Sequence, residues 1–167
     1  MIDKDIEIVR LNLVIEELKT KVNKYKYDHL TGLKQRSDFK ELCHSRFEEY
    51  LHNQSDFILI LIDLNGLHTV NREQGYRAGD DFILGTATKI KALFNKADNF
   101  RLGGDEFVSI CNGANIELCK DKLKKIPDIT YGITEVSNKF KTSRELFDEI
   151  DRQLIEKKQE SNTTTRG

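Results

Sequence analysis

The stretch NFRLGGDEFVSI, residues 99–110, combines the pattern of a β-hairpin with an unusual tip. Gly103 and Gly104 supply the turn, because glycine accepts positive φ without steric cost. The acids Asp105 and Glu106 follow at once, where the second strand begins. A tight turn explains the glycines but not two adjacent carboxylates, whose side chains point to opposite faces of a strand. Either these acids are surface charges on a turn, or a cation lies beside them.

The segment FILILIDLNG, residues 57–66, is an apolar run that ends at Asp63. Such a run predicts a central strand buried on both faces. From residue 57 onward the predicted order of elements is β-α-β-β-α-β-α, and its first six elements are those of the ferredoxin-like fold. We therefore expect an α+β fold with a mostly antiparallel central sheet and helices on one face. Further elements are predicted as helices over about 33–52, 78–95, 115–126 and 143–159, a hairpin over 99–111, and a last strand over 128–136.

Residues 2–26 contain no glycine or proline and are predicted to form a helix. Apolar side chains recur there at alternating three- and four-residue steps, at Ile8, Leu11, Ile15, Leu18, Val22 and Tyr25. This heptad seam is suited to pairing with another helix, although an amphipathic helix docked on its own domain has the same pattern. The expected organisation is an N-terminal helix over 1–27, one domain over 28–160 and a disordered tail over 161–167.

The composition bounds the class of protein. The chain has 167 residues and a formal net charge of -1, so no bulk field favours nucleic acid or a membrane as a partner. No apolar run has the length of a transmembrane helix, and the N-terminus lacks the pattern of a signal peptide. Cys43, Cys111 and Cys119 lack the spacing of zinc ligands, which predicts reduced, mostly buried thiols in a cytoplasmic protein.

The predicted fold brings the acids of two segments together. In a ferredoxin-like sheet the first strand lies beside the hairpin, so Asp63 can meet Asp105 and Glu106. Carboxylates that close raise one another's pKa, and a divalent cation relieves the repulsion. Mg²⁺ prefers one or two carboxylates with water and substrate phosphates, and paired ions assist phosphoryl transfer. The alternative is that Asp63 merely ends a strand and the two hairpin acids form an ordinary polar turn.

Four blocks of this sequence together resemble a known family. RLGGDEF (101–107) resembles the signature of the GGDEF domain, the diguanylate cyclase domain of bacteria. DHLTGLKQR (28–36) is similar to its opening motif, with Gln35 where asparagine is usual. IDLNGLHTVNREQGYRAGD (62–80) and YGIT (131–134) resemble two further blocks in the family's order. The resemblance covers about residues 28–160 and implies a palm-type fold related to nucleotide cyclases and polymerases.

The resemblance implies a Mg²⁺- or Mn²⁺-dependent enzyme that condenses two GTP molecules into cyclic di-GMP. Each active site would hold one GTP, and two sites would face each other in a homodimer. Asp63, the carbonyl of Leu64 and Asp105 match metal ligands. Glu106 matches the family's acid that binds metal or helps to deprotonate the 3′-hydroxyl.

The resemblance also implies a set of substrate contacts. Asn71 and Asp80 match the guanine-binding residues, and a carboxylate suits guanine because it accepts from both N1–H and N2–H. Asp80 could instead be a helix N-cap, and Lys158, which matches a phosphate-binding lysine, could be a surface residue. The remaining contacts are expected from backbone N–H groups near the β- and γ-phosphates and from glycines beside the α-phosphate: Asn65, Gly66, Leu67, His68, Gly103 and Gly104.

Several positions depart from the family pattern. His68 stands where lysine is usual, Arg72 replaces an aspartate, Tyr76 replaces a histidine and Asn162 replaces an arginine. The product-inhibition motif R-x-x-D retains Asp98 but has Asn95 in place of the arginine, so we expect no high-affinity inhibitory product site. An alternative to the cyclase is therefore a weak or inactive module that binds GTP and signals through its N-terminal helix. A relative that makes another cyclic dinucleotide is a third alternative.

Overall fold

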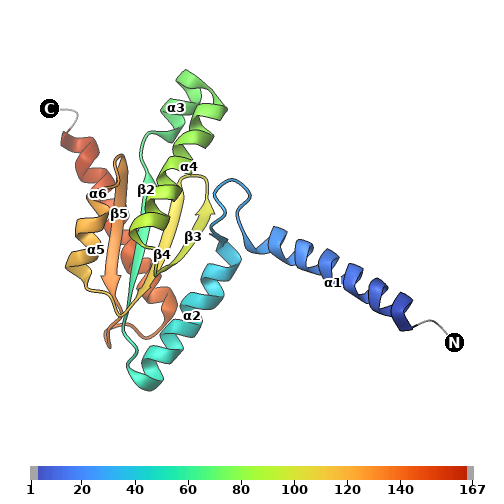
Figure 1. The fold of residues 1–167 in the computed structure, drawn as a ribbon. Helices are drawn as coiled ribbons and strands as arrows, with labels where there is room; N and C mark the ends of the chain where they lie inside the picture. Colours follow the sequence, from blue (N-terminus) through green and yellow to red (C-terminus); the bar gives the residue numbers. More distant parts are fainter. Residues whose placement is uncertain (1–3, 165–167) are drawn as a thin grey trace.

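The computed structural model describes residues 4–164, without the side chains of 5, 20, 22–25 and 161–164. A mixed sheet with helices on both sides follows the N-terminal helix (Figure 1). In chain order the elements are α1 (Lys4–Lys26), β1 (Lys34–Gln35), α2 (Arg36–Asn53), β2 (Phe57–Leu64), α3 (Leu67–Gln74), α4 (Tyr76–Leu93), β3 (Asp98–Gly103), β4 (Glu106–Asn112), α5 (Ile116–Leu123), β5 (Ile129–Glu135) and α6 (Ser143–Thr164).

The sheet has five strands in the order β1-β3-β4-β2-β5. Strand β2 is antiparallel to both β4 and β5, and β3 is antiparallel to β4. Only the two-residue strand β1 is parallel to its neighbour β3, among the residues described. The α+β class and the mostly antiparallel sheet are thus confirmed, with the predicted first strand next to the hairpin.

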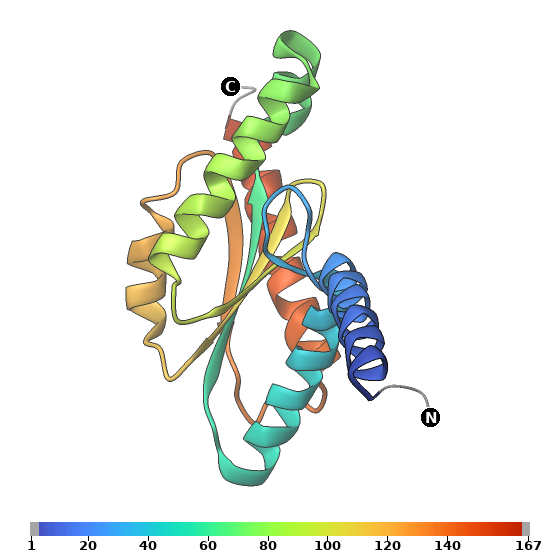
Figure 2. The same ribbon diagram turned by 45° about the vertical axis from the view of Figure 1, so that its right-hand side comes forward.

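The prediction that the helices lie on one face is wrong. All eight residues of β2 are buried, because its alternate side chains enter two separate cores. Leu59 and Leu61 pack with α2 and α6, whereas Ile60 and Ile62 pack with α4 and α5. Figure 2 shows the two pairs of helices on opposite sides of the sheet. An apolar run without alternation requires this double cover.

Several element boundaries differ from the sequence-based expectation. Helix α3 was not predicted, and it begins at Leu67 inside the stretch expected to be a loop. Gly75 separates α3 from α4, which starts at Tyr76, two residues before its predicted start. Helix α6 is capped by the Thr142 hydroxyl, which accepts from the N–H of Glu145 at 3.2 Å.

The C-terminal helix is longer than predicted. It runs to Thr164, so four residues of the expected disordered tail belong to a helix. The prediction for 165–167 falls outside the described residues. The three cysteines are free and buried, as predicted. None of the helices that the structure describes is long and apolar enough to cross a bilayer.

Helix α1 extends away from the body of the domain (Figure 1). Its seam side chains Ile8, Leu11, Ile15 and Leu18 are all about half exposed, between 45% and 55%. The side chains of Val22 and Tyr25 lie outside the described part of the chain. Docking of α1 on its own domain is therefore not what the structure has, and the apolar surface of the helix is open to a partner.

Candidate functional site

The site is built around a cross-strand pair of acids. Asp63, near the end of β2, lies directly opposite Glu106, the first residue of β4, in the antiparallel register. Opposed residues of a sheet share a face, so both side chains point to the α2 and α6 side. Asp63 is only 5% exposed, and Glu106 is half-buried. The register of one strand pair thus brings together acids that are 43 positions apart in the sequence.

The third predicted acid joins them from the turn. The carbonyl of Asp105 accepts a hydrogen bond from the N–H of Leu64 at 2.9 Å, which fixes the hairpin tip against the end of β2. Burial, and then the charges of Asp105 and Asp63, raise the pKa of Glu106 above its ordinary value, although Arg36 opposes them. The three predicted acids thus lie near one another, and the charges of Asp105 and Asp63 help to raise the pKa of Glu106.

Lys158 reaches the same point from α6. Its Nζ lies 2.6 Å from Asp63 Oδ2, while Asp63 itself is nearly fully buried. The ion pair brings Lys158 beside the predicted acids and gives the buried carboxylate of Asp63 a counter-charge. Its contact with a phosphate stays a prediction.

The donor set fits a hard cation, although no preformed cage is present. Within the part of the chain that the structure describes, no three His, Cys, Asp or Glu side chains are arranged to hold a metal ion. Mg²⁺ commonly takes only one or two protein carboxylates and completes its shell with water and phosphate oxygens. Asp63 and Glu106 supply such carboxylates, and the raised pKa of Glu106 marks a place where added positive charge is favourable.

A second set of contacts holds the hairpin tip in place. Gly103 and Gly104 have φ values of 145° and 51°, which side chains rarely tolerate. Arg101 Nε and Nη2 donate to the carbonyl of Gly104 at 3.1 and 2.8 Å. Its Nη1 donates to both carboxylate oxygens of Asp28, at 3.0 and 3.2 Å. One guanidinium therefore ties the turn that carries the acids to the segment that follows α1.

Asp28 is itself well organised for this contact. Its carboxylate accepts from the N–H and the hydroxyl of Thr31, at 2.8 and 2.7 Å. Burial would raise the pKa of Asp28, but the hydrogen bonds from Thr31 and the contact with Arg101 lower it overall. The sequence contains both Asp28 and Arg101 inside quoted motifs, but it offers no signal that they touch, because they are 73 positions apart.

The segment 65–68 is partly the beginning of a helix. Gly66 precedes α3, so Leu67 and His68 stand in its first turn, where backbone N–H groups lack acceptors within the helix. Such a turn suits an anion, which agrees in kind with the predicted phosphate contacts. Asn65 differs, because its N–H donates to the carbonyl of Asp128 at 2.7 Å. A metal contact from the Leu64 carbonyl stays a prediction.

The two predicted guanine contacts come from packed helices. Asn71 lies on α3, and a Cβ added at Gly79 of α4 would come within 1.9 Å of its Oδ1. A side chain at position 79 would therefore displace the Asn71 side chain from its present place. Asp80 is exposed on the next position of α4, and four residues of the helix precede it. The alternative that Asp80 is an N-cap is excluded, while its contact with guanine stays a prediction.

The departures from the family pattern lie at the edge of this site. His68, Arg72 and Tyr76 are exposed, and the side chain of Asn162 is outside the described residues. Asp98, the remaining acid of the product-inhibition motif, is half-buried and pairs with Lys34 Nζ at 2.5 Å and with Arg46 Nη2 at 4.0 Å. Cations of this chain thus already neutralise Asp98.

Comparison with known proteins identifies the family to which this chain belongs. Residues 25–164 match the family model described as "Diguanylate cyclase, GGDEF domain". Diguanylate cyclase DgcM of Escherichia coli is 26% identical over 146 residues, which are 79% of this chain and 36% of that protein. Diguanylate cyclase DgcS of Shewanella oneidensis is 31% identical over 88 residues, or 52% of this chain and 30% of that protein. The chain thus spans about a third of the length of either relative.

Solved structures agree on the fold. The coiled coil and GGDEF domain of DgcB from Caulobacter crescentus, a complex with c-di-GMP, superposes with a TM-score of 0.85. The identity is 17%, and the match covers 92% of this chain and 91% of that one. The GGDEF domain of FimX from Pseudomonas aeruginosa gives a TM-score of 0.73 at 19% identity, over 78% of this chain and 92% of that one. The palm-type GGDEF architecture expected from the sequence is therefore confirmed.

Proposed function

Because this chain belongs to the diguanylate cyclase GGDEF domain family, we propose that it condenses two GTP molecules into cyclic di-GMP and releases pyrophosphate. The observation that carries the proposal is the cross-strand pair Asp63–Glu106 beside the hairpin turn. A fold alone does not assign an activity, whereas this pair offers the chemistry that the reaction needs.

In the proposed reaction the 3′-hydroxyl of each GTP attacks the α-phosphate of the other, and pyrophosphate leaves. Asp63, Asp105 and Glu106 would hold Mg²⁺ or Mn²⁺, which when bound stabilises the negative charge on the phosphates. Glu106 is also suited to accept the proton of the hydroxyl, since its raised pKa makes it a stronger base than an ordinary glutamate. The first turn of α3 would face the β- and γ-phosphates.

Lys158 has a defined part in this proposal. It pairs with Asp63 at 2.6 Å and keeps 42% of its side chain exposed. Its ammonium group is therefore close enough to the proposed metal ligands to contact a phosphate of the bound nucleotide. Gly103 and Gly104 would leave space beside the α-phosphate, because neither carries a side chain.

Selection of guanine would depend on Asp80 and Asn71. A carboxylate accepts both donors of the Watson–Crick edge of guanine, whereas adenine presents an acceptor at N1. A hydrogen bond to a charged group is worth about 1.5–3 kcal/mol, so one mispaired contact already gives a tenfold to hundredfold preference for GTP.

The proposed enzyme works as a homodimer. One site holds one GTP, so the two reacting nucleotides must come from facing sites. The exposed seam of α1 is the feature that supports association of two chains. Because the reaction uses GTP with Mg²⁺, the expected location is the cytoplasm.

One experiment tests the proposal directly. Purified protein is incubated with GTP, ATP and Mg²⁺, and the products are identified by mass. Cyclic di-GMP that disappears in Glu106→Ala and in Asp105→Ala, both still folded by circular dichroism, is the expected result. In Asp80→Ser we expect mixed guanine–adenine products to rise, because a hydroxyl can donate as well as accept.

Other outcomes would contradict the proposal. Saturable GTP binding without any product would identify a non-catalytic nucleotide-binding module. Unchanged turnover in Glu106→Ala would remove the assigned acid from the mechanism. Equal use of ATP and GTP by the wild-type protein would remove the role of Asp80.

A further inference from the structure

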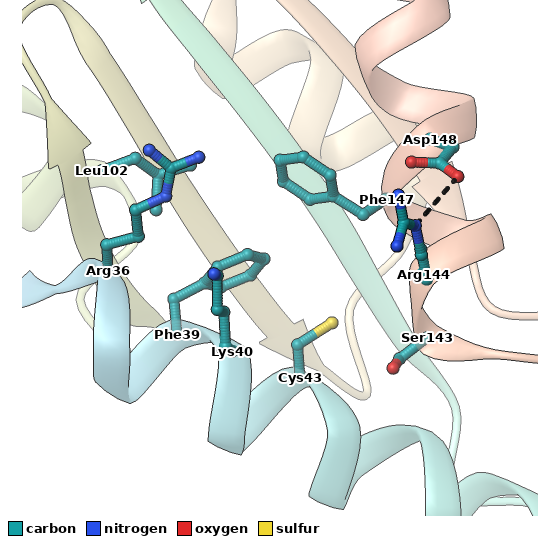
Figure 3. A pocket seen from close by; sticks show the side chains of 9 residues that line it. All are labelled: Arg36, Phe39, Lys40, Cys43, Leu102, Ser143, Arg144, Phe147 and Asp148. Atoms are coloured by element: carbon teal, nitrogen blue, oxygen red, sulfur yellow. Dashed lines mark ion pairs between the residues drawn. The ribbon is translucent and has the colours of Figure 1, made fainter.

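A cavity of about 450 Å³ lies between α2 and α6, on the side of the sheet that Asp63 also faces (Figure 3). Its lining comes from the first half of α2, from the first turns of α6 and from Leu102 of β3. It includes none of the three acids of the proposed active site. The volume is in the range of sites that bind small molecules.

The rim of the cavity is basic. Arg36 and Lys40 stand one turn apart on α2, and Arg144 faces them from α6 (Figure 3). Asp148 is the single carboxylate of the lining, 3.9 Å from Arg144. Among the residues that the structure describes, Arg36 and Lys40 form no salt bridge, so the lining has three cations and one anion.

The interior of the cavity is aromatic. The rings of Phe39 and Phe147 lie 5.5 Å apart between centroids, tilted by 51°. Phe39 is buried in the core, whereas Phe147 stays half-exposed on the cavity side. A partly exposed ring beside unpaired cations provides both a face for a planar group and donors for an anion.

We propose that this cavity binds a small phosphorylated molecule that carries an aromatic group. The excess of two positive charges in the lining matches a phosphate dianion, and a guanidinium group binds phosphate with two parallel hydrogen bonds. The aromatic group packs against Phe147, and the hydroxyl of Ser143 at the same opening adds a donor. The bound molecule lies beside Leu102, the residue before the turn that carries the proposed catalytic acids.

Phenyl phosphate is the probe that tests this proposal, by isothermal titration calorimetry of the full chain without GTP or divalent metal. We expect saturable binding that is at least about tenfold tighter than that of inorganic phosphate or of benzyl alcohol, because each of these lacks one half of the recognised chemistry. We expect Lys40→Glu to weaken binding by about tenfold or more, and Phe147→Leu to weaken phenyl phosphate but not inorganic phosphate.

Two controls locate the binding. Lys125→Glu makes the same charge change at an exposed position outside this cavity and should leave the affinity unchanged. Lys158→Ala removes the cation of the proposed active site and should also leave it unchanged. No saturable binding to the wild-type protein, equal loss in Lys125→Glu, or loss in Lys158→Ala instead of Lys40→Glu would overturn the proposal.

Discussion

Strand β2 and helix α1 are both rich in aliphatic side chains, yet those of the strand are buried and those of the helix are exposed. Every residue of β2 is buried, and all seven of its apolar side chains are exposed by 1% or less. In α1 the aliphatic residues from Ile6 to Leu18 are exposed by 45% to 67%. The side chains of the strand pack within their own chain, on both sides of the sheet, whereas the apolar side chains of the helix stay exposed.

This difference assigns the stability of the domain to the buried strand β2 and leaves the exposed helix α1 for the proposed association of two chains. The domain is stabilised by the two cores that meet at β2, and α1 adds little to them. The acids of the proposed active site stand at the end of the buried strand, so their positions are set within one chain. In the proposed homodimer, the arrangement of two active sites face to face would instead depend on the exposed helix α1. The predictions that follow test this division.

The largest effect on stability is expected from the buried strand. Ile60→Ala leaves a cavity where the side chain is now fully buried, and it should lower the free energy of unfolding by about 2–5 kcal/mol. Urea denaturation followed by circular dichroism, at concentrations where the monomer predominates, measures this.

Leu11→Ala is the matched control, because it shortens a leucine that is 55% exposed. We expect a change within about 0.5 kcal/mol under the same conditions. A loss in Leu11→Ala as large as that in Ile60→Ala would mean that α1 packs on its own domain.

Association of two chains, unlike stability, should depend on the side chains of α1. Replacing Leu11 and Leu18 by lysine puts charges into the seam of α1, so cyclic di-GMP formation should fall about tenfold or more at low protein concentration and recover partly at high concentration. Specific activity measured across a dilution series checks this. Specific activity that is independent of concentration in both proteins would show that the seam does not join two active sites.

Loss of the Arg101 contacts at the hairpin turn should have an intermediate effect on stability. Arg101→Ala removes two donors from the Gly104 carbonyl and the counter-charge of Asp28, so it should cost about 1–3 kcal/mol of stability. Arg152→Ala is the control, because Arg152 pairs with Glu149 and Glu156 on the exposed surface of one helix. That change should stay within about 0.5 kcal/mol. Equal losses of stability in the two variants would argue against a special role of Arg101 at the hairpin turn.

The smallest effect concerns Glu106 and pH. Its pKa is raised in the folded protein by burial and by Asp105 and Asp63, so its ionisation destabilises the fold. Without divalent metal, the wild-type protein should therefore lose stability relative to Glu106→Gln as pH rises through the folded pKa. Below the ordinary value of about 4.5 both forms are neutral, and the difference should vanish. Thermal unfolding at pH 4 and pH 7 measures it, and a variant less stable than wild type at pH 7 would contradict the sign.

Much of the fold was predictable from local patterns. The apolar run of β2 and the glycines of the hairpin specify their own conformations, because buried strands and positive φ require such residues. The same run already required cover on two faces, and the one-faced prediction failed because it followed the ferredoxin-like order instead. Helix α3 was missed because it has only eight residues, none of them buried, which is too short for its pattern to stand out from a loop.

The candidate site divides in the same way. Asp63, Asp105 and Glu106 were candidates from the sequence, because the predicted fold brought their strand ends together and the GGDEF resemblance assigned them to a metal site. The tertiary structure decided which of them meet. It set Asp63 opposite Glu106 through strand register, brought Lys158 to Asp63 from the far end of the chain, and joined Arg101 to Asp28. Such contacts depend on distances between segments that lie far apart in sequence, and local propensity contains no information about them.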